Sequence, residues 1–73
     1  MQGIVLYTKK ECTLCDEVRA LLDLFSVEVT EIDIESDPEL HEKYFLEIPV
    51  VRIKEEELDY RSIDYFELQK RLQ

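Results

Sequence analysis

Two cysteines three residues apart constrain the fold of this chain more than any other feature of its sequence. They are Cys12 and Cys15, and the chain has no others. The run before them, residues 3–7, is almost entirely apolar and predicts a strand buried on both faces. After them, apolar residues recur at helical spacing among charged ones and predict an amphipathic helix; they are Leu14, Val18, Leu21, Leu22 and Phe25. The pair therefore lies where a buried strand leads into a helix.

This position favours thiol chemistry. The first turn of a helix presents unpaired backbone N–H groups and the positive end of the helix dipole, which stabilise a thiolate. We therefore expect the pKa of the Cys12 thiol to lie below the ordinary value of about 8.5. Cys12, at the exposed edge, is the expected nucleophile, and Cys15, on the apolar face, the expected resolving thiol. Thr13 and Leu14 hold the two sulfurs within disulfide reach and are expected to contact the substrate.

The length of the chain predicts one domain, residues 1–73, in which the core supplies only about 3–5 kcal/mol of stability. One glycine, two prolines and no low-complexity tract give no sign of a linker. The sequence contains no signal-peptide pattern and no apolar run long enough to span a bilayer, so we expect a cytoplasmic protein. In that reducing compartment a close cysteine pair indicates catalysis or metal binding.

The charge of the chain excludes two classes of partner. Eighteen acidic and nine basic residues give a net charge of −9, which repels nucleic acid and anionic membranes. Lys9 and Lys10 are an exception beside the cysteines. They are either solvated loop charges or groups that stabilise the thiolate and attract an anion. We expect a monomer whose substrate is a disulfide-containing protein or a small thiol.

A β-branched run at residues 27–34 predicts a second strand. Joined to the first strand through a helix, it forms a right-handed βαβ unit with parallel strands. The apolar side chains change parity between Val29 and Ile32, which predicts a bulge near Thr30 and Glu31.

Two prolines mark the next elements. Ser36 or Asp37 caps a short helix that has Pro38 in its first turn. Pro49 cannot donate to a strand ladder, so it is expected at the start of a strand over residues 50–53.

The rest of the chain predicts a hairpin and a final helix. Residues 54–57 form a charged loop without Gly or Asn, expected to be looser than a tight turn, and residues 58–61 return as an edge strand. Ser62 is expected to cap the last helix. Aromatic side chains in this half are expected to pack in the core or at its rim; they are Tyr44, Phe45, Tyr65 and Phe66. The predicted order is β-α-β-α-β-β-α.

Several segments together resemble glutaredoxins, and more closely a small bacterial glutaredoxin-like family whose physiological role is not settled. They are residues 12–16 (CTLCD), 29–34 (VTEIDI), 37–40 (DPEL) and 44–50 (YFLEIPV). The resemblance implies an α/β thioredoxin-like fold. Its four-stranded mixed sheet has the order 2-1-3-4, with the third strand antiparallel to the first and three helices around it.

The resemblance also implies roles for individual residues. Pro49 would be cis and face the nucleophilic cysteine, and Ile48 would offer its backbone to an extended substrate. Lys9 matches a lysine that contacts a glutathione carboxylate, and Asp64 matches an acidic residue before the last helix. The Gly-Gly pair of glutathione-binding members is replaced by residues 61–62 (RS), so that pattern is incomplete. No cofactor is implied, and the electron donor would be glutathione or a reductase.

These observations predict a dithiol–disulfide oxidoreductase that uses Cys12 and Cys15. Two alternatives remain open. One is a thioredoxin-like adaptor or regulatory module with little turnover, since a fold does not determine a function. The other is a metal or iron–sulfur site, which the two cysteines could complete only with carboxylates, with His41 or through a dimer.

Overall fold

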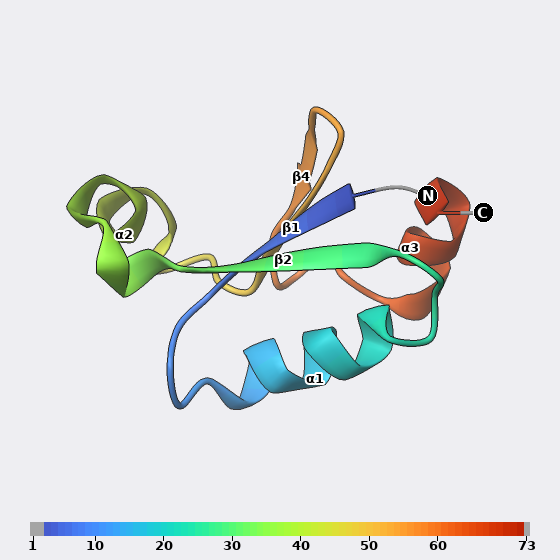
Figure 1. Ribbon diagram of the computed structural model, residues 1–73, viewed down its shortest axis with the longest axis horizontal. Coiled ribbons are helices and arrows are strands. Elements are labelled where there is room, and N and C mark those ends of the chain that lie inside the picture. Colours follow the sequence, from blue (N-terminus) through green and yellow to red (C-terminus); the bar gives the residue numbers. More distant parts are fainter. Residues whose placement is uncertain (1–2, 73) are drawn as a thin grey trace.

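The structure is a computed structural model that describes residues 3–72. The predicted order of helices and strands is confirmed, with one additional short 3₁₀ helix, η1 (Figure 1). The elements are β1 (Gly3–Thr8), α1 (Thr13–Leu22), β2 (Glu28–Asp33), η1 (Ile34–Ser36), α2 (Pro38–Tyr44), β3 (Val50–Ile53), β4 (Glu56–Leu58) and α3 (Tyr65–Leu72). No helix among the described residues is both long and apolar enough to cross a membrane.

The four strands form one mixed sheet in the order β2-β1-β3-β4, as predicted. β1 pairs in parallel with β2 and antiparallel with β3, and β3 pairs antiparallel with β4. In this register Tyr7 lies opposite Val50, so the end of β1 meets the beginning of β3. The chain segments that follow β1 and precede β3 therefore lie next to each other.

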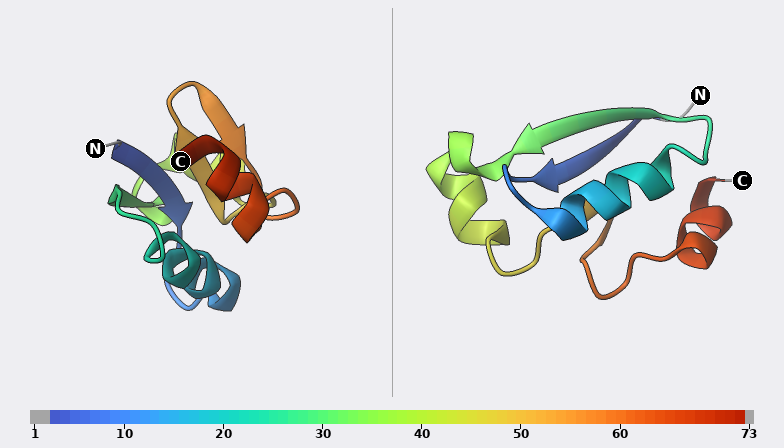
Figure 2. Two further views of the ribbon diagram at one scale, coloured as in Figure 1. Left: turned by 90° about the vertical axis from the view of Figure 1, so that its right-hand side faces the viewer. Right: turned by 90° about the horizontal axis from the view of Figure 1, so that it is seen from below.

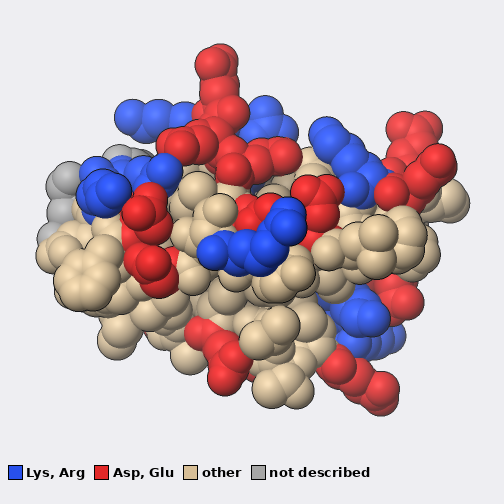
Figure 3. Space-filling view, turned by 180° about the vertical axis from the view of Figure 1, so that it is seen from behind, with Lys and Arg blue, Asp and Glu red and all other residues tan. Residues whose placement is uncertain are grey.

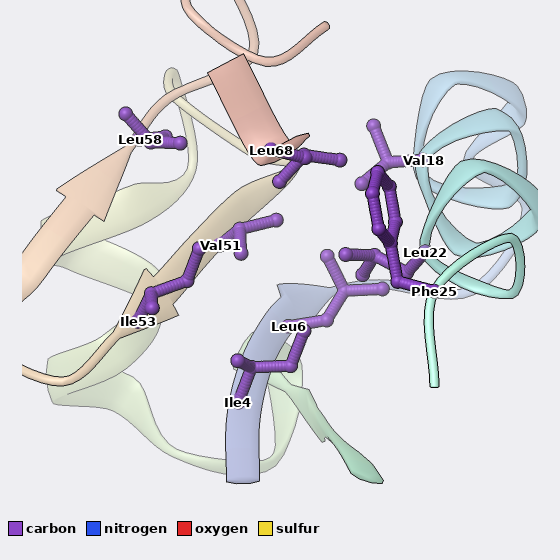
Figure 4. Packing of buried hydrophobic residues seen from close by; sticks show 9 residues of the cluster. All are labelled: Ile4, Leu6, Val18, Leu22, Phe25, Val51, Ile53, Leu58 and Leu68. Carbon is purple, nitrogen blue, oxygen red and sulfur yellow. The ribbon is translucent and has the colours of Figure 1, made fainter. Parts of the chain in front are cut away.

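Both faces of the sheet carry an apolar core. α1 and α3 cover one face (Figure 2), and nine buried residues from the two helices, the turn after α1 and the sheet meet there (Figure 4). α2 lies at one end of the sheet (Figure 1), and a smaller cluster beneath it consists of Tyr7, Ile34, Tyr44 and Val50. Successive side chains of β1 point alternately into the two cores, which explains why this strand is almost wholly apolar.

The predicted bulge in β2 is absent. β2 pairs with β1 without interruption from Glu28 to Asp33. Val29 packs against the core beneath α1 and α3, whereas Ile32 packs against the core beneath α2. The change of parity has another cause than a bulge: one strand contributes side chains to two cores on opposite faces of the sheet.

The hairpin is tighter than the sequence predicted. Ile53 pairs with Glu56, so only Lys54 and Glu55 form the turn, and β4 is shorter and begins earlier than expected. Lys54 has a φ of 58°, the positive value that primed turns have at this position. The prediction of a loose loop is wrong because it assumed that a tight turn needs a glycine or asparagine here.

One of the two predicted helix caps is confirmed and the other is wrong. Asp37 caps α2, its carboxylate accepting from the N–H of Glu39, and Pro38 stands in the first turn. Ser62 does not cap α3: Asp64 does, through a 2.8 Å hydrogen bond from the N–H of Glu67.

The aromatic residues of the second half differ in burial. Tyr44 is buried, and Tyr65 stacks on Phe25 with ring centroids 5.4 Å apart. Phe45 and Phe66 are largely exposed, so of the two predicted places, the core or its rim, the core is excluded for them.

Candidate functional site

Cys12 and Cys15 form a disulfide at the N-terminus of α1, with Cα atoms 5.2 Å apart. Cys12 is the N-cap residue, in extended conformation, and its Sγ accepts a hydrogen bond of 3.2 Å from the backbone N–H of Cys15. A sulfur atom thus occupies the place of the usual oxygen cap. The free N–H groups and the dipole of the helix point at this sulfur, so a thiolate there would be stabilised.

The two cysteines differ in exposure. The Cys15 side chain is 2% exposed and lies on the buried face of α1, with Val18 and Leu22. Cys12 is only partly buried and stands at the edge of the helix. The sequence predicted this asymmetry from the helical spacing. Cys12 is therefore the more accessible of the two cysteines.

The turn before Cys12 holds a residue that sequence reasoning missed. Glu11 has a φ of 57°, in the left-handed region that non-glycine residues adopt rarely. Because glutamate has no special preference for this region, no sequence signal pointed to it. The conformation turns the chain from the end of β1 into the extended N-cap.

Ile48 and Pro49 are joined by a cis peptide bond, as the resemblance implied, and Pro49 directly precedes β3. The N–H of Ile48 donates to the carbonyl of Tyr44 at 3.0 Å. The Ile48 N–H is therefore engaged within the chain.

A groove of about 180 Å³ runs along α1 on the β3 side of β1. We call it the apolar groove; it is lined by Leu14, Glu17, Val18, Leu21, Pro49, Tyr60 and Ile63. Leu14, expected on the buried face of α1, is 52% exposed and forms part of this surface. Tyr60 is 43% exposed, and its N–H donates to the Glu47 carbonyl at 3.3 Å, which ties this wall to the segment before Pro49.

The sequence predicts substrate contact for Leu14 and Pro49, and the structure brings both into this groove together with Tyr60 and Ile63, which the sequence did not single out. These two residues come from the loop between β4 and α3, and no local pattern indicates that this loop returns to α1.

A second depression, of about 290 Å³, lies beside the end of β1 on its β2 side. We call it the charged hollow; it is lined by Thr8, Lys9, Lys10, Glu11, Asp16, Glu31 and Asp33. The two lysines are exposed, as is Thr13 at the start of α1. Lys9 and Lys10 therefore belong to a different surface from Leu14 and Pro49, and four carboxylates share that surface with them.

Asp64, the residue matched to a glutathione-binding acid, follows Ile63 and has a structural contact of its own. Its carboxylate caps α3. The neighbouring Arg61 is paired with Asp59 at 3.0 Å and lies over the Tyr60 ring. Hydrogen bonds from Arg61 hold the pKa of the Asp59 carboxyl below its usual range.

The sequence also left open a metal or iron–sulfur site at the two cysteines. Among residues 3–72, no group of three or more His, Cys, Asp or Glu side chains is arranged to hold a metal ion.

The fold and the site define a thioredoxin-like domain, in which a C-x-x-C disulfide begins the first helix and a cis-proline begins the strand beside it. The chain belongs to the family described as Glutaredoxin-like domain (DUF836), which matches residues 3–73. This confirms the resemblance found in the sequence. A comparison with curated proteins finds no significant match.

Two solved structures are similar over nearly the whole chain. A crystal structure of a mutant of the thioredoxin-like protein BC3987 is 24% identical, with a TM-score of 0.74 and coverage of 96% of this chain and 99% of the other. At that identity the likeness shows the fold. The X-ray structure of target protein XcR50 from X. campestris is 30% identical, with a TM-score of 0.71 and coverage of 92% and 91%.

Proposed function

We propose that this protein is a dithiol–disulfide oxidoreductase. The observation that supports this most directly is the Cys12–Cys15 disulfide at the N-terminus of α1, with Cys12 accessible and Cys15 buried. A nucleophilic thiol must be reachable and stabilised as the thiolate, whereas a resolving thiol needs only to reach its partner. The N-cap position of Cys12 favours its thiolate. The 5.2 Å between the two Cα atoms lets Cys15 reach Cys12.

The reaction proceeds in two exchanges. The Cys12 thiolate attacks one sulfur of a substrate disulfide, and the other substrate sulfur leaves as a thiolate that takes up a proton. Cys15 then loses its proton and attacks the Cys12 sulfur, which releases the second substrate thiol. Two electrons pass from the dithiol to the substrate, and the chain is left with the Cys12–Cys15 disulfide. A small thiol or a reductase then returns it to the dithiol.

The test compares wild-type protein with Cys12→Ser and Cys15→Ser. Wild type should reduce a protein disulfide such as that of insulin in the presence of a thiol donor, and Cys12→Ser should lose this activity. Cys15→Ser should accumulate a covalent mixed disulfide at Cys12, visible by mass spectrometry. The Cys12 thiolate absorbance of this variant should titrate below about 8.5.

Equal rates for wild type and Cys12→Ser would contradict the proposal and favour the adaptor alternative. A Cys12 thiol that titrates at the ordinary value and traps no partner would lead to the same conclusion. Circular dichroism on each variant checks that the fold is kept.

A further inference from the structure

The surfaces on the two sides of Cys12 differ in character but agree in the sign of their charge. The charged hollow is lined by two lysines and four carboxylates, and one of these carboxylates, Glu31, also lies 3.8 Å from the Arg19 guanidinium. The net charge of the hollow is negative even with this arginine counted. The apolar groove is lined by one charged residue, Glu17, which is exposed. Within residues 3–72 Glu17 forms no ion pair, so no basic partner offsets its charge.

Two basic residues adjoin groove residues in the sequence, and both are paired. Arg19 follows Val18, and its guanidinium lies 3.0 Å from the Asp23 carboxylate. Arg61 follows Tyr60, and its guanidinium is held by the Asp59 carboxylate at 3.0 Å. Each pair contributes little net charge to the groove. Glu17 therefore sets the sign of the potential along this surface, within a protein of net charge −9.

The space-filling view from behind shows how charge is distributed over one face of the molecule (Figure 3). Charged side chains of both signs lie over the upper part of this face. The lower part is mainly uncharged, with acidic side chains at its lower edge and a group of basic side chains on its right-hand side.

We propose that the apolar groove selects protein disulfides whose cysteine is flanked by a large apolar residue and by basic residues, and that it disfavours glutathione. This inference rests on the proposed function. Leu14, Tyr60 and Ile63 bury the apolar side chain, and Glu17 attracts the basic one. Glutathione, with two carboxylates and one ammonium group, finds net negative charge on both sides of Cys12.

Electrostatic complementarity of this kind acts mainly on the association rate and weakens with ionic strength. The preference should therefore appear in the rate of the first exchange and shrink in high salt. The apolar contribution should remain in high salt, because it depends on buried area.

The experiment measures how fast Cys12 of the Cys15→Ser variant attacks disulfides that carry a coloured thionitrobenzoate leaving group. The probes are a Leu-Lys-Cys peptide, its Leu-Glu-Cys twin, a Ser-Lys-Cys peptide and glutathione, each normalised by its rate with N-acetylcysteine. At low salt the Leu-Lys-Cys probe should react at least about tenfold faster than its acidic twin and than glutathione. The ratio should fall several-fold in 1 M salt, where the screening length is about 3 Å.

Variants on the protein assign the effect to the groove. Glu17→Lys should remove or reverse the basic preference, whereas Glu28→Lys, the same charge change at the far end of β2, should leave most of it. Leu14→Ser should remove the advantage of the Leu-Lys-Cys peptide over the Ser-Lys-Cys peptide. Leu14 and Glu17 are exposed, so neither change should disturb the fold.

The outcomes separate the two proposals. Equal normalised rates for basic, acidic and glutathione probes, or a preference that Glu17→Lys leaves intact, would overturn the groove assignment while leaving the exchange reaction standing. If no probe reacts faster than with the free thiol, the proposed function itself fails.

Discussion

At the scale of single residues, Tyr44 is the polar side chain whose burial has the clearest consequence. Its ring is 4% exposed and stacks on Tyr7, with centroids 4.4 Å apart. Its hydroxyl donates to the Glu57 carboxylate at 2.6 Å, which joins α2 to the edge strand β4. Burial and then the neighbouring Glu57 raise the pKa of Tyr44 far above its ordinary value of about 10.

Tyr44→Phe should lower the free energy of unfolding by about 1 kcal/mol at pH 7, because one hydrogen bond is lost and Glu57 can return to water. The raised pKa also implies a pH dependence. Tyr44 stays protonated in the folded state while the unfolded tyrosine ionises near pH 10. Stability that is fully present below pH 10 is therefore lost as the pH rises toward the folded-state pKa.

Urea unfolding at pH 8 and above pH 10 measures both effects. Wild type should lose more stability over this range than Tyr44→Phe. Tyr60→Phe, which removes the hydroxyl of a substantially exposed tyrosine, is the matched control. Identical pH dependence in wild type and Tyr44→Phe would contradict the argument.

At the scale of helices and strands, two of the connecting turns place a residue in a backbone conformation that it rarely adopts. The chain has one glycine, Gly3, which lies in β1, and within residues 3–72 the left-handed positions in the turns are occupied by Glu11 and Lys54. One of these turns leads into the cysteine pair and the other closes the hairpin. A residue with a Cβ in this conformation costs roughly 1 kcal/mol or more.

Lys54→Gly should raise the free energy of unfolding by about 0.5 kcal/mol, since relief of the left-handed strain exceeds the entropy that glycine adds to the unfolded chain. Glu55→Gly, in the same turn but at a position with negative φ, should lower it by a similar amount. Thermal or urea unfolding measures both. Stabilisation by both substitutions, or by neither, would show that the turn is not strained at Lys54.

The start of α3 provides a second test of this kind. Asp64→Ala should cost about 1 kcal/mol, because the Glu67 N–H loses its cap. Ser62→Ala, which removes the cap that the sequence suggested, should change stability by less than about 0.5 kcal/mol. The reverse order in chemical denaturation would restore the sequence-based assignment.

At the scale of the whole molecule, the core beneath α1 and α3 joins these two helices to the sheet. Leu68 is fully buried in it, between the sheet and α1 (Figure 4). Most other apolar residues of α3 are at least partly exposed, so this helix depends on few contacts. α3 also carries Arg71, which pairs with Glu56 of β4 and Glu67 of its own helix, each at 2.8 Å.

Leu68→Ala should lower the free energy of unfolding by about 2–5 kcal/mol, which approaches the whole stability of a domain this small. Leu46→Ala removes the same side chain where it is 75% exposed and should change stability little. Denaturant midpoints of the two variants give the comparison. Similar losses would mean that α3 does not complete the core.

The sequence was sufficient for the features that depend on local periodicity. The buried β1, the amphipathic α1, the strand after Pro49 and the different exposures of Cys12 and Cys15 all follow from spacing along a strand or a helix. These patterns survive folding because each element must bury one stripe or face, whatever its neighbours are.

The rest required residues far apart in the chain to meet. Nothing near Tyr60 or Ile63 shows that their loop forms a wall against Leu14 and Glu17, nor that one strand, β2, packs into two cores. The left-handed Glu11 and Lys54 oppose local preference and are held by the packing of the segments on either side. Strands, helices and the cysteine pair could be inferred from local spacing, whereas the apolar groove arises where the β4–α3 loop packs beside α1.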